Sequence, residues 1–282
     1  MWHKSVQMDL PKLDRTQSLP ETHNTKPCVN FLIVGAQKAG TTALSTFLSA
    51  HSDLFLPKVE AHYFDVDTLD WEAPDYEVYE RKFRAALPHQ LIGAKIPIYM
   101  FWDNSMERIH AYNPDIKLIA VLRHPAHRAY SNWKMEAIKG LETMSFSDAI
   151  RTGRARSLVN EDEKQLNKRR FSFVERGFYA PQIERMLKYF GRDQILFLTN
   201  DQMKTNQPGC LDQVCLFLDV DKFETYPPNA TIQPKLNLFQ PSQINLLPAS
   251  VEDMAYLNRV YADDIVVTAA LTGLDLNHWL PN

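Results

Sequence analysis

The stretch Phe31-Leu-Ile-Val-Gly-Ala-Gln-Lys-Ala-Gly-Thr-Thr-Ala-Leu44 decides the fold of this 282-residue chain. Its apolar beginning predicts a buried strand, Gly35 and Gly40 indicate a tight loop, and the apolar spacing through Leu48 predicts the start of a helix. Such a loop points backbone N–H groups at one place, where the helix N-terminus adds partial positive charge. We therefore predict a site for a phosphate-like anion; the alternative is a glycine turn that serves only strand–helix packing.

The position of the lysine in this loop argues against a nucleoside triphosphate. In a Walker A motif the lysine directly follows the last glycine. Here Lys38 comes before Gly40, and the residue that follows Gly40 is Thr41. Triphosphate chemistry also needs Mg²⁺, but the strand expected at Lys117–Leu122 is followed by Arg123 rather than by an acidic residue. We expect a phosphate-bearing donor that is bound by basic side chains without a metal.

Composition indicates one large domain. The chain is 45% hydrophobic and 23% charged with a net charge of −3, which gives no sign of a nucleic-acid or anionic-membrane partner. Its three cysteines argue against a disulfide framework, and no apolar run approaches the roughly 20 residues of a membrane span. The polar N-terminus lacks the apolar core of a signal peptide. We expect a flexible arm over residues 1–28, a single domain over residues 29–282 and a cytoplasmic location.

Strands alternate with helices along the chain, which predicts an α/β fold with three layers and a central, mainly parallel sheet. Ligands bind at the carboxyl ends of the strands in such sheets. The glycine loop, the segment 58–65, Lys95 and Arg123 all follow expected strand ends, so they can converge on one cleft. The patterns also predict helices over 76–86 and 145–156, and an exposed loop or lid over 157–170.

A second motif is Arg123-His-Pro-Ala-His-Arg-Ala-Tyr-Ser131, at the start of an expected helix. Arginine makes bidentate contacts to phosphate, and serine can donate a hydrogen bond to a phosphate oxygen. Arg128 lies one helical turn after Arg123. The alternative is a helix start with solvated arginines.

Together these motifs resemble those of the sulfotransferases that use 3′-phosphoadenosine 5′-phosphosulfate (PAPS). The glycine loop resembles their 5′-phosphosulfate loop, and Arg123 with Ser131 their 3′-phosphate motif. Glu60-Ala-His-Tyr-Phe-Asp65, Lys95-Ile-Pro-Ile-Tyr99 and Gly177-Phe-Tyr179 are similar to segments of the heparan sulfate sulfotransferase branch. The resemblance covers about residues 30 to 220 and implies a P-loop-containing fold, with PAPS as co-substrate and 3′-phosphoadenosine 5′-phosphate (PAP) as product.

The resemblance also implies individual roles. Lys38 is expected at the bridging oxygen of the phosphosulfate, where negative charge grows as the S–O bond breaks. Lys235 is a substitute candidate for a C-terminal Lys-Gly element of the family that this chain lacks. The full donor-binding set is Gln37, Lys38, Ala39, Gly40, Thr41, Thr42, Arg123, Ser131, Tyr179 and Lys235.

Two residues are candidates for the general base. By resemblance Glu60 is the first choice, and His62 is the alternative because its free pKa lies near neutrality. On a strand, both side chains would face the same side. Lys95 is expected to orient Glu60 or to contact the sulfuryl group. Nearby aromatic residues either line an acceptor pocket or belong to the core: Tyr63, Phe64, Tyr99, Phe101 and Trp102.

The acceptor is the least determined part. We expect neither the membrane anchor nor the disulfide-closed loop of the animal glycan-modifying members that the chain resembles. This favours a cytosolic tailoring enzyme of bacterial type that sulfates a hydroxyl or amine nitrogen of a small metabolite, such as a natural product or toxin alkaloid. A saccharide acceptor is the alternative. A second alternative for the function is a P-loop kinase or a non-catalytic nucleotide-binding module. A homodimer is left open.

Overall fold

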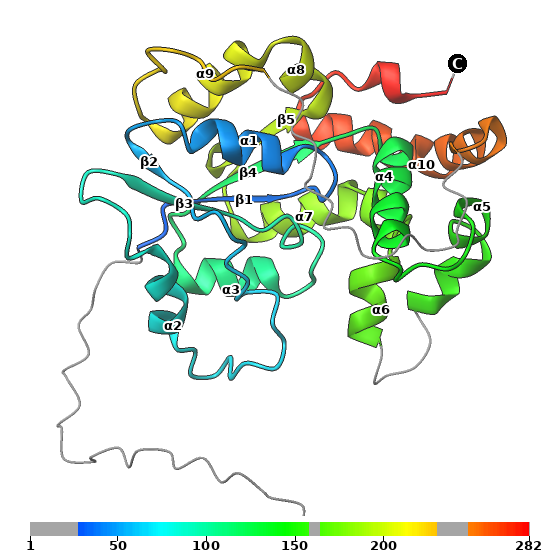
Figure 1. Cartoon of the computed structure of the whole chain (residues 1–282), viewed down its shortest axis with the longest axis horizontal. Helices are drawn as coiled ribbons and strands as arrows, with labels where there is room; N and C mark the ends of the chain where they lie inside the picture. The colour runs from blue at the N-terminus through cyan, green and yellow to red at the C-terminus, as the bar shows by residue number, and fades with distance from the viewer. Residues whose placement is uncertain (1–27, 158–163, 230–247, 282) are drawn as a thin grey trace, which may run out of the picture.

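The computed structural model describes residues 28–157, 164–229 and 248–281 (Figure 1). Within them five parallel strands form one sheet in the order β2-β3-β1-β4-β5. Every residue of β1 is buried, as expected for a strand that is covered on both faces of a parallel sheet. The strands are β1 Phe31–Gly35, β2 Leu54–Phe55, β3 Leu91–Lys95, β4 Lys117–Leu122 and β5 Ile195–Thr199.

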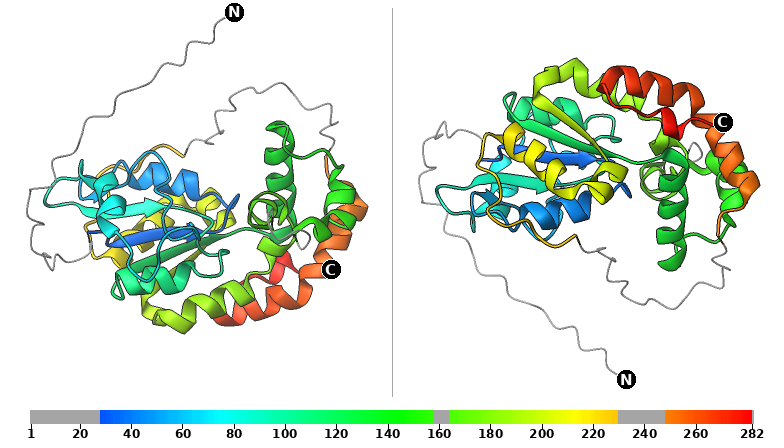
Figure 2. Two further views of the ribbon diagram at one scale, coloured as in Figure 1. Left: turned by 90° about the horizontal axis from the view of Figure 1, so that it is seen from below. Right: turned by 90° about the horizontal axis from the view of Figure 1, so that it is seen from above.

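Helices cover both faces of the sheet, so the predicted three-layer α/β fold is confirmed. Figure 1 shows α1, α8 and α9 on one side and α3 and α7 on the other. Both views in Figure 2 show α4, α5 and α6 beyond the carboxyl ends of the strands, and α10 packs against α4 and α7. The helices are α1 Thr41–Leu48, α2 Tyr76–Glu80, α3 Ser105–Tyr112, α4 Pro125–Ile138, α5 Phe146–Ala149, α6 Lys164–Phe171, α7 Ala180–Tyr189, α8 Asn200–Thr205, α9 Gln207–Leu218 and α10 Val251–Thr272.

Three sequence predictions are wrong. The helix expected over 145–156 is divided into α5 and a 3-10 turn, Thr152–Ser157, and Gly153, a poor helix former, stands in that turn. The helix expected over 76–86 ends as α2, followed by the 3-10 turn Arg81–Phe83. The loop expected over 157–170 contains most of α6. That helix has no apolar stripe, but its lysines and arginines have good helix propensity.

The part of the chain that the structure describes contains no helix long and apolar enough to cross a membrane. The arm expected over residues 1–28 lies outside the described residues, apart from Cys28.

A glycine sets the close approach of β1 and β3. Phe31 pairs with Gly93 across the two strands and is fully buried. A Cβ atom at Gly93 would lie 2.1 Å from Cζ of Phe31. The aromatic ring therefore occupies the space that any side chain at position 93 would need.

Replacing Gly93 with alanine should destabilise the fold because the methyl group would collide with Phe31. We expect the free energy of unfolding to fall by about 1–3 kcal/mol, measured by urea denaturation. In the double variant Phe31→Leu/Gly93→Ala the loss should be smaller than the sum of the two single losses, since leucine leaves room for the methyl group. Full additivity would contradict this packing argument.

Candidate active site

The loop between β1 and α1 is fixed through its carbonyl groups. Nη1 of Arg123 donates to the carbonyl of Lys38 at 3.0 Å, and Nδ2 of Asn200 donates to that of Ala39 at 2.9 Å. Lys38 and Gly40 have positive φ angles of 72° and 102°, a sparsely populated conformation for lysine. A Cβ at Gly40 would also lie 2.7 Å from Nδ2 of Asn200. The first N–H groups of α1, which have no partner within the helix, can therefore bind an anion beside this loop.

Two cations border the loop without a counter-ion. Neither Lys38 nor Arg123 forms an ion pair with a carboxylate of the described residues, and Nζ of Lys38 instead lies 3.5 Å from Sδ of Met135. Burial lowers the pKa of Lys38, and the cations of Lys139 and Arg123 lower it further. Burial is also the main cause that lowers the pKa of Arg123. Since a bound anion would relieve this repulsion, the residues present fit the phosphate groups of PAPS.

The other residues predicted to bind the donor differ in their exposure. Ser131 is half-buried on α4, whereas Thr42 is exposed at the start of α1. Tyr179 is fully buried, and its hydroxyl donates to the carbonyl of Arg123 at 2.8 Å. Tyr179 therefore supports Arg123 from within the protein and has no free surface for the nucleotide.

Arg128 does not belong to the donor site. It is fully buried, donates to Oδ1 of Asn132 at 3.1 Å and also donates to the carbonyl of Phe173. Its position one turn after Arg123 therefore serves packing between α4 and the segment before α7. Lys235, the C-terminal candidate, lies outside the described residues.

The structure brings Glu60, His62 and Lys95 together beside the donor loop. Nζ of Lys95 lies 2.7 Å from Oε1 of Glu60 and donates to Oγ1 of Thr42 at 3.4 Å. Nε2 of His62 lies 3.3 Å from Oε2 of Glu60, and its Nδ1 lies 2.8 Å from Oδ2 of Asp65. Glu60 and His62 are in a loop rather than on the expected strand. The imidazole of His62 therefore lies between the carboxylates of Glu60 and Asp65.

These contacts set the charge state of the cluster. Hydrogen bonds to Asp65 and Glu60 raise the pKa of His62 to about 9, so the imidazole is protonated near neutral pH. Burial raises the pKa of Glu60, but hydrogen bonds from His62 and Lys95 outweigh it and hold the pKa below its usual value. Burial of Asp65 is likewise outweighed by His62 and Arg169, which keep its pKa low. At neutral pH the cluster contains two carboxylates and an imidazolium.

Two arginines next to this cluster were missed by the sequence analysis. Arg169 of α6 lies 2.6 Å from Oδ2 of Asp65. Arg176 donates to Oε1 of Gln37 in the donor loop and to the carbonyl of Arg169 at 2.7 Å. Burial lowers the pKa of Arg176 to about 9, and it forms no ion pair with the described carboxylates. The basic run 168–170 was a signal for the first arginine, whereas Arg176 stands alone in the sequence.

The aromatic residues near Glu60 form core rather than an acceptor pocket. Tyr63, Phe64, Tyr99 and Trp102 are all at most 4% exposed, and only Phe101 is half-buried. The hydroxyl of Tyr99 accepts from the backbone N–H of Tyr63 at 3.1 Å. These rings therefore form the part of the core on which the loop with Glu60 and His62 packs.

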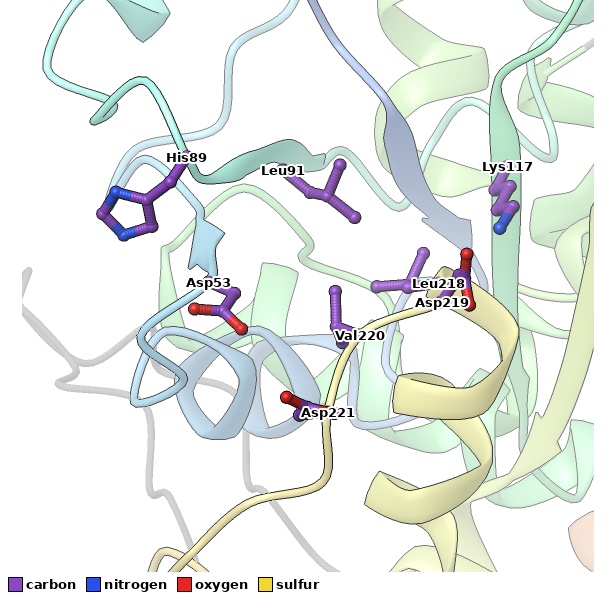
Figure 3. A pocket seen from close by; sticks show the side chains of 8 residues that line it. All are labelled: Asp53, His89, Leu91, Lys117, Leu218, Asp219, Val220 and Asp221. Atoms are coloured by element: carbon purple, nitrogen blue, oxygen red, sulfur yellow. The ribbon is translucent and has the colours of Figure 1, made fainter.

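A pocket of about 560 Å³ lies at the opposite edge of the sheet (Figure 3). Its walls include Leu91 and Lys117, the first residues of β3 and β4, whereas the donor loop follows the carboxyl end of β1. This pocket is therefore separate from the candidate site. Its lining residues are Asp53, His89, Leu91, Lys117, Leu218, Asp219, Val220 and Asp221.

Comparisons with known proteins identify the family of the chain. The family model described as "Sulfotransferase domain" matches residues 29–235. Human heparan sulfate glucosamine 3-O-sulfotransferase 6 is 32% identical over 202 residues, which cover 69% of this chain and 53% of that protein. Mouse heparan sulfate glucosamine 3-O-sulfotransferase 3A1 is 28% identical over 213 residues, 74% of this chain and 50% of that protein. The chain spans about half the length of the curated relatives it matches.

A solved structure supports the fold independently. The sulfotransferase from Alicyclobacillus acidocaldarius superimposes with a TM-score of 0.73 at 24% identity, covering 89% of this chain and 98% of that one. Because the family model covers most of the chain, the protein belongs to the sulfotransferase family, whose members use PAPS as donor. The family resemblance stated from the motifs is confirmed.

The raised pKa of His62 predicts a pH-dependent contribution to stability. The usual value is 6.5 and the folded value about 9, so folding favours the protonated imidazole. This stabilisation is fully present below pH 6.5 and is lost as the pH rises through about 9. Urea denaturation across this pH range gives the free energy of unfolding of the wild type and of His62→Gln. The wild type should be the more stable of the two, and by the largest amount at the acidic end. A difference that does not change with pH would argue against the two carboxylate contacts.

Proposed function

We propose that the protein transfers the sulfuryl group of PAPS to a hydroxyl group, with a saccharide as the favoured acceptor class. One observation carries the proposal: Lys95 contacts both Glu60 and Thr42. Thr42 is the second residue of α1, the helix that follows the donor loop, so a carboxylate is held next to the place where a phosphosulfate would bind. An anion site adjacent to a base is the arrangement that in-line group transfer requires.

On the donor side, the chain supplies positive charge. The N-terminus of α1 and Lys38 are proposed to hold the 5′-phosphosulfate, and Arg123 with Ser131 the 3′-phosphate. Lys38 would stabilise the negative charge on the bridging oxygen while the S–O bond breaks and PAP departs. The depressed pKa of Lys38 suits this role, because the lysine then gains most from an anionic neighbour. Catalysis without a metal stays a prediction.

On the acceptor side, we assign Glu60 as the general base. Its pKa is held low, so it is a carboxylate at neutral pH and can accept the proton of the acceptor hydroxyl as the oxygen attacks sulfur. His62 is engaged through both ring nitrogens and is protonated, which favours a role in orienting Glu60. Lys95 orients the same carboxylate from the donor side.

Two observations favour a saccharide hydroxyl. The side chains of Glu60 and His62 are 36% and 43% exposed, so the base faces an open surface that suits a large acceptor. The relatives of 28–32% identity have names that identify heparan sulfate glucosamine as their acceptor. A hydroxyl or amine of a small metabolite is the second candidate, favoured by the net charge of −3, which would repel a long polyanion.

The cysteines bear on the cellular location. Cys28, Cys210 and Cys215 are all free thiols. Free thiols are the rule in reducing compartments. We therefore propose a cytoplasmic location.

The activity can be tested with PAPS carrying radioactive sulfate and a panel of saccharides, small alcohols and amines. We expect labelled product with saccharide hydroxyls. Lys38→Ala should lower kcat about a hundredfold or more, since it removes charge stabilisation of the leaving oxygen, and Glu60→Gln should lower it similarly by removing the base. Wild-type turnover in Lys38→Ala would contradict the leaving-group role, and full activity in Glu60→Gln would contradict the choice of base.

Binding of nucleotides tests the 3′-phosphate assignment separately. Calorimetry should show that Arg123→Ala weakens the binding of PAP, because a bidentate charged contact is lost. The same substitution should hardly change the affinity for adenosine 5′-phosphosulfate, which lacks the 3′-phosphate. Equal weakening of both ligands would show that Arg123 supports the loop through the carbonyl of Lys38 rather than the 3′-phosphate.

A further inference from the structure

Resting on the proposed function, we infer that Arg169, carried by α6, is a positioning residue that fixes Asp65 and, through it, His62 and the base Glu60. This arginine lies outside the motifs that resemble those of the sulfotransferases and comes 104 positions after Asp65 in the chain. The inference makes α6 a part of the acceptor half of the site rather than a surface loop.

The guanidinium of Arg169 contacts Asp65 through two of its nitrogens. Nη1 lies 2.6 Å from Oδ2 of the carboxylate, and Nη2 donates to the backbone carbonyl of the same residue. The guanidinium is planar and contacts both a side-chain oxygen and the main-chain oxygen of Asp65, so it restricts rotation of the Asp65 side chain. Asp65 is fully buried, and its Oδ1 has no hydrogen-bond partner in the described part of the chain. Arg169 and His62 therefore share one carboxylate oxygen, Oδ2.

This arrangement decides which way the imidazole faces. With Oδ2 fixed, Nδ1 of His62 donates to Asp65 at 2.8 Å, and Nε2 is directed at Glu60 at 3.3 Å. A carboxylate behind an imidazole sets its orientation and charge in this manner. If Asp65 could rotate, its unpaired Oδ1 would compete for His62, and Glu60 would lose the partner that orients it.

The helix that carries Arg169 is docked by other charged groups. Lys168 forms an ion pair with Asp103, and the guanidinium of Arg169 stacks 4.2 Å above the ring of Trp102. Arg176 donates to the carbonyls of Lys168 and Arg169 at 3.4 and 2.7 Å. Cations near the C-terminal end of a helix are stabilising, so Arg176 holds this end of α6 in place.

The test compares Arg169→Ala, Arg169→Lys and the neighbouring Arg170→Ala, because Arg170 is on the same helix but is not among the described partners of Asp65. One readout needs no turnover: the NMR titration of the Asp65 carboxyl carbon. Removing the guanidinium should raise the titration midpoint of Asp65, since burial then acts with less opposition. Arg169→Lys should restore part of the shift, and Arg170→Ala should leave the wild-type value.

The second readout is kinetic and uses a double-mutant cycle with Asp65→Asn. Arg169→Ala should lower kcat roughly tenfold to a hundredfold, with PAP affinity changed little. Thermal stability should fall as well, because the buried Asp65 loses an ion-pair partner, so kcat is measured well below the melting temperature of the variant. Because Arg169 acts through Asp65, Arg169→Ala should cause no further loss in the Asp65→Asn background.

Two results would overturn the inference: an unchanged Asp65 titration in Arg169→Ala, or losses of kcat that add in full. Absence of sulfuryl transfer in the wild type with every acceptor would instead reject the proposed function. The NMR titration would then still decide whether Arg169 fixes Asp65.

Discussion

Unpaired positive charge is the constraint on which the rest of the site depends. Lys38, Arg123 and Arg176 are partly or wholly buried, and none forms an ion pair with the carboxylates of the described residues. Burying a charge without a partner is unfavourable, so the surrounding groups must hold these cations in place. The hydroxyl of Tyr179 supports the backbone of Arg123, and Arg123 and Asn200 hold the loop carbonyls. The missing negative charge is the one that a phosphosulfate donor would bring.

The acceptor half of the site has the opposite electrostatic character. Lys95 is paired with Glu60, Arg169 with Asp65, and His62 lies between the same two carboxylates, so each cation there has a carboxylate partner. Cations with carboxylate partners therefore lie next to cations without them, which suits the two tasks proposed above: binding an anionic donor on one side and taking a proton from a neutral hydroxyl on the other. This contrast agrees better with a hydroxyl acceptor than with a second anionic ligand.

The sequence predicted best what is local in the chain. The β1–loop–α1 unit is contiguous, so its glycines, apolar runs and lysine were readable, and the parallel sheet followed from the alternation of elements. Glu60, His62 and Lys95 could be named from motifs, but the choice between the two bases depended on contacts that only folding creates. Arg169 was missed because a polar helix without an apolar stripe looks like a loop, and its partner Asp65 is distant in sequence.

The partly buried lysine of the donor loop has a cost outside catalysis. Lys38 adopts a left-handed backbone conformation and is repelled by neighbouring cations, and both effects disfavour the folded state when no anion is bound. Any anion that binds only the folded state raises the melting temperature by mass action. We therefore expect a stability–activity compromise, in which the lysine proposed to bind the donor also lowers the stability of the ligand-free fold.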